Sequence, residues 1–219
     1  MEFFMYETVV FDLDGTIIDS AEGIMNSFTY ALSAMGLPVP PREEMGVFIG
    51  PPLLYSFEKI CALPREQAER AVEIYREYSR EKGMYEITVY EGVEALLQKL
   101  KAAGKRIVLA TSKYEPYALK ILENIGLAEY FDFAAGSLAG GERETKAEVI
   151  EYALLRTGAE KKTAVMVGDR MHDMLGAKEA GIASVGVLYG YGSRAELLES
   201  GAVHIAETHG EIYGIICKK

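Results

Sequence analysis

Short apolar runs alternate with stretches of helical periodicity, both near the start of the chain and throughout its second half. Each run has the length of a strand and carries few charges, which is typical of strands buried on both faces of a parallel sheet. Between the later runs, apolar residues recur three and four positions apart, and a glycine ends each stretch. The alternation predicts an α/β fold, a doubly wound parallel sheet. The runs assigned to strands are residues 9–11, 107–110, 131–134, 164–167 and 184–188.

The interval between the first two strands is too long for one crossover helix. Residues 19–85 hold three helical patterns of their own, and Gly36 and Gly83 are expected to cap helix C-termini. We therefore expect an inserted α-helical cap at 19–85 and a core domain formed by residues 1–18 and 86–219. Because the insertion leaves and rejoins beside the end of the first strand, we expect a mobile lid; the alternative is additional core.

The composition excludes several classes of partner. The chain has 219 residues and a formal net charge of -10, which opposes binding to nucleic acid or to anionic membranes. No apolar stretch is long enough to cross a bilayer, and the first residues lack the basic region and cleavage site of a secretory signal. The two cysteines, Cys61 and Cys217, have no metal-binding spacing. We expect a cytoplasmic protein, and the sequence does not indicate its oligomeric state.

Two carboxylates, Asp12 and Asp14, directly follow the first apolar run. Aspartate is unfavourable in strands, so two of them at a strand end indicate a site; the alternative is an ordinary turn bonded by an aspartate side chain. The carboxyl ends of parallel strands share one edge of a sheet, where ligands bind. The other polar residues expected at this edge are Thr111, Ser112, Lys113, Lys146, Asp169 and Asp173.

Four carboxylates at one edge repel one another, and a divalent cation relieves that repulsion. Oxygen ligands without a cysteine or histidine cage favour Mg²⁺, which also accepts phosphate oxygens. The sequence therefore predicts a Mg²⁺ site at the carboxyl ends of the strands.

These segments resemble, in order and spacing, the four motifs of phosphatases of the haloacid dehalogenase superfamily. The first motif, DxDGT, corresponds to residues 12–16, the second to Thr111, the third to Lys146 and the fourth, GDxxxD, to residues 168–173. The resemblance covers essentially the whole chain and lies near the phosphoglycolate phosphatase branch, which has a helical cap. One position departs from the pattern, because Ala147 follows the lysine where many relatives have proline.

The resemblance implies a role for each carboxylate. Asp12 would attack phosphorus and become an aspartyl-phosphate, while Asp14 would protonate the leaving group and then activate water. The backbone carbonyl of Asp14, together with Asp12 and Asp169, would hold the metal. Asp173 would lie in the outer shell or act as a further ligand.

Hydroxyl, amide and ammonium groups would complete the site. By resemblance, Thr111 and the amide of Ser112 hold phosphoryl oxygens, and Lys146 balances the negative charges. For Lys113, a local salt bridge and a contact with substrate both stay open.

Three further segments have a functional and a purely structural interpretation. In the expected cap, Gly50 and Leu53 lie in a turn that could approach the substrate, and a plain turn between helices is equally consistent. His172 is expected to be an exposed loop histidine. Residues 189–193 are expected to form a loop and a helix N-cap rather than a binding loop.

The function expected from the sequence is that of a phosphoric monoester hydrolase acting on a small phosphorylated metabolite, either phosphoglycolate or a nucleoside 5′-monophosphate. A phosphosugar mutase and a pyrophosphatase of the same superfamily are the enzymatic alternatives. A non-enzymatic phosphoacceptor module is less consistent, because it needs neither a second acid nor a helical cap. The core would hold the same phosphoryl group in each case, so the substrate depends on the cap.

Overall fold

The computed structural model describes residues 6–138 and 142–217. The chain divides into two compact units. The sheet unit consists of Met1–Ile18 and Val89–Lys219, and the helical unit of Asp19–Thr88. Two short strands, β2 (Ile18–Asp19) and β3 (Thr88–Val89), pair where the chain passes from one unit to the other.

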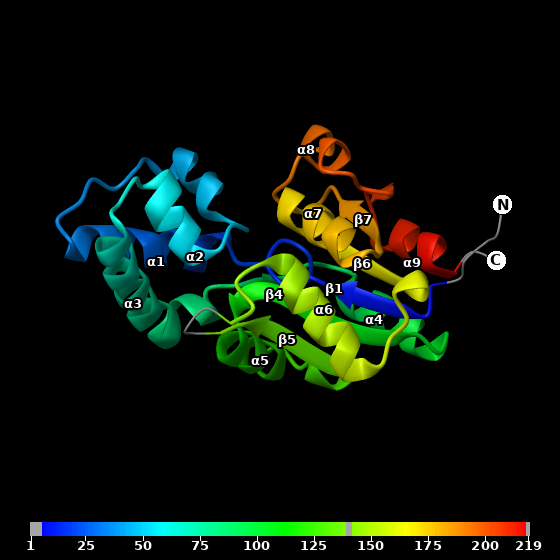
Figure 1. The fold of residues 1–219 in the computed structure, drawn as a ribbon. Coiled ribbons are helices and arrows are strands. Elements are labelled where there is room, and N and C mark those ends of the chain that lie inside the picture. The colour runs from blue at the N-terminus through cyan, green and yellow to red at the C-terminus, as the bar shows by residue number, and fades with distance from the viewer. Residues whose placement is uncertain (1–5, 139–141, 218–219) are drawn as a thin grey trace. The chain divides into compact units, whose positions relative to one another are not determined.

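Six parallel strands form the sheet, in the order β5-β4-β1-β6-β7-β8 (Figure 1). The first strand lies inside the sheet between β4 and β6, and all four of its residues are buried. The strands are β1 (Thr8–Phe11), β4 (Arg106–Tyr114), β5 (Phe133–Ser137), β6 (Ala164–Gly168), β7 (Ala183–Val187) and β8 (His204–Ala206).

Helices flank this sheet and supply the rest of its core. Helices α6 and α7 pack against each other and against strands β4 to β7, while α4 packs against β4 and α9. The helices are α4 (Val93–Ala102), α5 (Glu115–Asn124), α6 (Lys146–Thr157), α7 (Met171–Ala180), α8 (Arg194–Glu199) and α9 (His209–Cys217). A parallel sheet covered by crossover helices confirms the predicted fold class.

Two parts of the sheet unit differ from the sequence prediction. Strand β5 begins at Phe133 rather than at residue 131, because Ala128–Tyr130 form a 3₁₀ turn and the side chain of Asp132 accepts a hydrogen bond from the Ile107 amide (2.8 Å). No prediction covered β8 or α9, and only the N-cap of α8 was expected. A strand of three residues and a helix of six are too short to show a period, and glycines 210 and 214 interrupt the apolar pattern of α9.

The helical unit is held together by aromatic packing. Phe28 stacks on Phe48 with ring centroids 4.3 Å apart, and it also contacts Phe57 (4.8 Å) and Tyr75 (5.0 Å). These rings come from four different segments, which the cluster packs together. The segments of the helical unit are α1 (Ala21–Ala34), a 3₁₀ helix (Arg42–Phe48), α2 (Leu53–Tyr55), a π-helical turn (Ser56–Ile60), α3 (Arg65–Glu81) and a second 3₁₀ turn (Gly83–Tyr85).

Of the two glycines expected to cap helices, Gly36 and Gly83, only the first has the backbone conformation of a cap. Gly36 has a left-handed φ of 67° just after α1, as expected of a glycine that ends a helix. The same prediction for Gly83 was wrong, because it does not have a left-handed φ and opens a 3₁₀ turn. A side chain at Gly83 would come within 2.6 Å of the Ser27 hydroxyl, and one at Gly23 would overlap the Gly83 carbonyl. Glycine is needed there for close packing of two segments rather than for a cap.

Candidate active site

The register of the sheet brings three strand ends to one level. Strand β1 pairs in parallel with β4 and β6, and the amide of Asp12, the first residue after β1, donates a hydrogen bond to the Val167 carbonyl (2.9 Å). Thr111 on β4 and Asp169 after β6 follow within one or two positions of this level. The structure therefore brings the predicted motifs to the same edge of the sheet.

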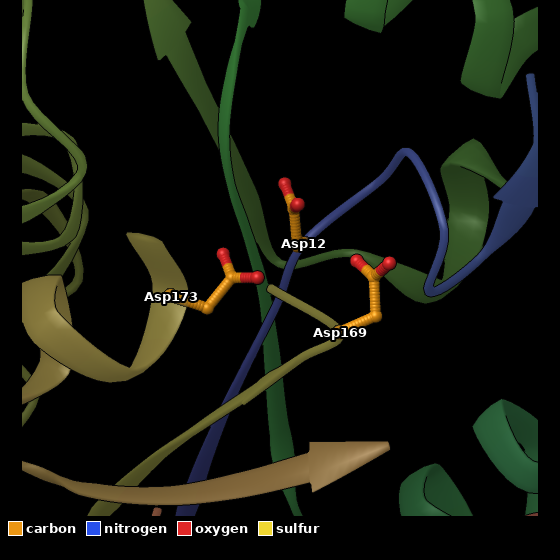
Figure 2. Close-up of side chains that lie close together, drawn as sticks. All are labelled: Asp12, Asp169 and Asp173. Atoms are coloured by element: carbon orange, nitrogen blue, oxygen red, sulfur yellow. The ribbon is translucent and has the colours of Figure 1, made fainter. Parts of the chain in front are cut away.

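Three carboxylates form the centre of this edge. Asp12, Asp169 and Asp173 offer oxygens that lie within 4.8 Å of one another (Figure 2). All three side chains are buried. Asp173 lies in the first turn of α7, where one of its oxygens accepts a hydrogen bond from the Arg170 amide (3.0 Å). A side chain at Gly168 would overlap the Asp173 carboxyl group, so the glycine of the fourth motif makes room for its last aspartate.

Lys146 is the cation of this cluster. Its ammonium nitrogen lies 2.7 Å from an oxygen of Asp12 and 2.8 Å from one of Asp173, and it donates to the Ala110 carbonyl (3.1 Å). The residue opens α6, whose N-terminus is fixed by a capping box of Thr145 and Glu148. Its aliphatic stem passes Gly176 of α7, where a side chain would come within 2.7 Å of it. The close approach of α6 and α7 thus delivers a buried ammonium to two buried carboxylates.

Asp169 is held from two sides. One carboxylate oxygen accepts a hydrogen bond from the backbone amide of Tyr191 (2.8 Å), and the other lies 3.5 Å from the Thr16 hydroxyl. Gly15, with a left-handed φ of 80°, passes so close that a side chain there would overlap the carboxylate. The glycine of the first motif is required both by its backbone conformation and by this contact.

Asp14 and Lys113 form a second ion pair, with 2.9 Å between carboxylate oxygen and ammonium nitrogen. Both side chains are largely buried. The Thr111 hydroxyl accepts a hydrogen bond from the Lys113 amide (3.2 Å), in the part of β4 where the register against β5 shifts. The hydroxyl of Ser112 is buried and makes no hydrogen bond within the described structure. Of the two possibilities for Lys113, the structure contains the local salt bridge.

Burial governs the titration of the cluster. It raises the pKa of Asp12 to about 6. The charge of Lys146 lowers this pKa, and the charge of Asp173 raises it further. Burial also raises the pKa of Asp169 well above the ordinary value, and the charges of Asp173 and Asp12 act in the same direction. For Lys146, burial lowers the pKa, but Asp12 and Asp173 outweigh it and the net shift is upward. The ammonium therefore stays charged.

Comparison with known proteins identifies the family. Residues 9–187 match the family described as haloacid dehalogenase-like hydrolase. The chain belongs to this family. It is 40% identical over 192 residues to a 5′-nucleotidase of Pseudomonas aeruginosa, an alignment that covers 88% of this chain and 87% of that protein.

Two further relatives extend the comparison. A crystal structure described as a predicted phosphatase from Clostridium acetobutylicum superposes with a TM-score of 0.95 at 41% identity and covers 98% of this chain and 100% of that one. The tyrosine-protein kinase PtkA of Mycobacterium tuberculosis is 40% identical over 194 residues, and the alignment covers 88% of this chain and 65% of that protein. The phosphatase and nucleotidase relatives support the enzyme class expected from the sequence, a phosphoric monoester hydrolase.

The acidic cluster of this family member has the donor set of a divalent metal site. Three buried carboxylates face one buried ammonium, and the guanidinium of Arg170, whose charge also acts on Asp169, is paired with Glu196 at 2.8 Å. The excess negative charge in a buried space favours a cation. Oxygen donors alone suit a hard divalent cation, so the residues fit a divalent metal site.

Not every predicted residue belongs to this cluster. Gly50 and Leu53 lie in the helical unit, where Gly50 has a left-handed φ of 103° and Pro52 precedes α2; their contact with substrate stays a prediction. His172 was wrongly expected in an exposed loop. It lies in the first turn of α7 and is partly buried, and burial lowers its pKa.

The segment 189–193 contributes more than was predicted. Ser193 is the expected helix N-cap, since its hydroxyl accepts a hydrogen bond from the Glu196 amide (3.1 Å). The rest of the segment contacts Asp169, which the sequence reasoning missed. One signal could have found it: the segment follows a predicted strand and so lies at the same sheet edge as the acids.

In the part of the chain that the structure describes, no helix has both the length and the apolar character needed to span a membrane. The cytoplasmic location stays a prediction.

Proposed function

We propose that the protein is a Mg²⁺-dependent phosphatase that hydrolyses a small phosphate monoester through an aspartyl-phosphate on Asp12. The observation that carries the proposal is the position of Asp12, which ends β1 among Asp169, Asp173 and the ammonium of Lys146. An ionised carboxylate fixed in this way is a nucleophile held in place for an in-line attack.

In the first step, a carboxylate oxygen of Asp12 forms a bond to phosphorus as the bond from phosphorus to the leaving oxygen breaks. Asp14 gives its proton to the leaving oxygen, and the alcohol departs. In the second step, water attacks phosphorus, Asp14 takes a proton from that water, and the bond between phosphorus and Asp12 breaks to release inorganic phosphate. Lys113, which pairs with Asp14 in the structure, orients the ionised carboxylate that takes the proton from water in the second step.

The residues proposed to hold Mg²⁺ are Asp12, Asp169 and Asp173, with the backbone carbonyl of Asp14. The ion supplies positive charge to the phosphoryl oxygens. Thr111 and the amide of Ser112 are proposed to bind those oxygens, and Lys146 to keep the nucleophile ionised and to neutralise charge in the transition state. The buried Ser112 hydroxyl, which has no partner in the described structure, offers a further donor.

For the substrate we propose phosphoglycolate or a nucleoside 5′-monophosphate. The 5′-nucleotidase name of the P. aeruginosa relative supports the nucleotide. The helical unit, with Gly50 and Leu53, is proposed to select between them, since the residues around Asp12 can hold only the phosphoryl group and the metal.

A substrate panel tests the proposal. Phosphate release is measured with phosphoglycolate, a nucleoside 5′-monophosphate, pyrophosphate and a sugar phosphate, each with Mg²⁺ and with EDTA. We expect the highest kcat/KM with one of the first two, and no turnover in EDTA. Highest efficiency with pyrophosphate, or isomerisation of the sugar phosphate without phosphate release, would replace the proposal by a pyrophosphatase or a mutase. A single phosphorylation of the protein without turnover would indicate a phosphoacceptor.

A further inference from the structure

We propose that the segment Tyr189-Gly190-Tyr191-Gly192, between β7 and α8, is a positioning element that holds the Asp169 carboxylate in the orientation needed to bind Mg²⁺. The inference rests on the proposed function, because it takes Asp169 as a ligand. It concerns residues outside the four motifs.

A backbone amide orients the Asp169 carboxylate. The amide of Tyr191 donates to one carboxylate oxygen at 2.8 Å, and the other oxygen faces the Thr16 hydroxyl at 3.5 Å. A hydrogen bond from a fixed backbone amide leaves the carboxylate little freedom to rotate. By contrast, Asp173 is oriented by an amide of its own helix, that of Arg170. The Tyr191 amide thus holds Asp169 from outside the four motifs, whereas the Arg170 amide and the Lys146 ammonium, which hold Asp173, belong to them.

The two glycines of the segment are required by space. A side chain at Gly190 would overlap the Asp169 side chain and the carbonyl of Gly15, and one at Gly192 would overlap the Asp169 carbonyl. Neither glycine has a left-handed φ, so alanine could adopt the backbone conformation of either. Only the closeness of the segment to Asp169 and Gly15 excludes a side chain.

Tyr189 anchors the segment. Its hydroxyl donates to the Thr16 carbonyl (3.0 Å), so the segment is tied to the residue whose own hydroxyl faces Asp169. Its ring packs against Tyr90 (5.2 Å between centroids) and against His209 (4.6 Å). The first motif and the segment 189–192 thus enclose Asp169 between them, and displacing the segment displaces the carboxylate.

Gly190→Ala tests the inference, with Gly214→Ala as the matched control. Gly214 lies in α9 of the same unit, has no left-handed φ, and a side chain there would meet no atom within 4 Å apart from its neighbours and the backbone of its own helix. Calorimetric titration of Mg²⁺ into each protein gives the affinity, and phosphate release at varied Mg²⁺ gives kcat. We expect Gly190→Ala to weaken Mg²⁺ binding by at least about tenfold, the usual effect of losing an outer-sphere contact to a metal ligand.

Excess Mg²⁺ separates positioning from general damage. With Gly190→Ala we expect kcat at saturating Mg²⁺ within about threefold of wild type, and Gly214→Ala should match wild type in affinity and in kcat. Unchanged Mg²⁺ affinity in Gly190→Ala, or a loss of kcat that saturating Mg²⁺ does not restore, would overturn the inference.

Tyr189→Phe serves as the second variant, should Gly190→Ala fail to fold. It removes the hydroxyl that bonds the Thr16 carbonyl and keeps the ring, so we expect about threefold weaker Mg²⁺ binding. A Mg²⁺ affinity of Tyr189→Phe equal to that of wild type would contradict the proposal that the segment positions Asp169. If the wild-type protein itself binds no Mg²⁺, the proposed metal dependence fails, and the inference fails with it; equal affinities in wild type and both variants reject the positioning role alone.

Discussion

The sheet unit and the helical unit bury different kinds of side chain. Among the described residues, every buried charged side chain belongs to the sheet unit: Asp12, Lys105, Lys146, Asp169 and Asp173. The buried polar residues of the helical unit are serines alone. A cavity of about 430 Å³ within the helical unit is also lined mainly by apolar side chains, such as Leu32, Phe48 and Leu63.

This difference indicates that the sheet unit carries the reaction site, while the core of the helical unit serves stability. Buried charges are unfavourable unless they are paired, so the sheet unit keeps them at the expense of stability, which is typical of a reaction site. The helical unit has a core of aromatic rings and is organised for packing. Substitutions in the two units should therefore have effects of different kinds.

The largest effect is expected for Asp12→Asn. The amide keeps the shape of the side chain but is no nucleophile, so turnover should fall by at least about 10³-fold while the circular dichroism spectrum is unchanged. Steady-state phosphate release at saturating Mg²⁺ is the measurement. A variant that keeps more than a tenth of the wild-type rate would reject the aspartyl-phosphate mechanism.

Phe28→Ala should mainly affect stability. Phe28 is fully buried and contacts three other rings, so its truncation should lower the free energy of unfolding by about 3–5 kcal/mol. Chemical denaturation measures the loss. Tyr55→Ala is the matched control, because this aromatic side chain of the same unit is 49% exposed and its removal should have a much smaller effect. Similar losses for both variants would refute the idea that the aromatic cluster holds the unit together.

The stability of the metal-free protein should depend on pH through Asp12. The folded pKa of Asp12, about 6, lies above its ordinary value of 3.8, so folding is favoured by the protonated form, and this contribution is lost as pH rises from about 4 to about 6. In EDTA, wild type should therefore lose stability relative to Asp12→Asn between pH 4 and pH 7, by on the order of 2–3 kcal/mol. Urea denaturation of both proteins at each pH measures the difference. If the difference in free energy of unfolding between the two proteins does not change with pH, burial does not raise the pKa of Asp12.

The sequence predicted the parts of the site that depend on local pattern. The strand before Asp12 and the helix opened by Lys146 both follow from apolar periodicity, and the parallel sheet then brings their polar ends together. What it did not predict depends on contacts between distant segments. Gly83 and Gly190 are glycines because another chain segment passes close by, and such a contact leaves no mark in the neighbouring sequence. The place of Tyr191 after a predicted strand indicates the sheet edge, but its contact with Asp169 was missed because a backbone amide does not depend on residue type.

The smallest effect is expected in the helical unit, for Leu53→Ala. If Leu53 contacts the part of the substrate beyond the phosphoryl group, its truncation should change the ratio of kcat/KM for phosphoglycolate to that for a nucleoside 5′-monophosphate by about fivefold, the scale of a few methylene contacts. Hydrolysis of a small activated phosphate, which presents little beyond the phosphoryl group, should stay within about twofold of wild type. Leu155→Ala is the control, since this leucine is 78% exposed on α6 of the sheet unit and should leave every ratio unchanged. A uniform fall across the panel with Leu53→Ala would make its role purely structural, and selectivity would then have to come from residues of the sheet unit such as Lys113.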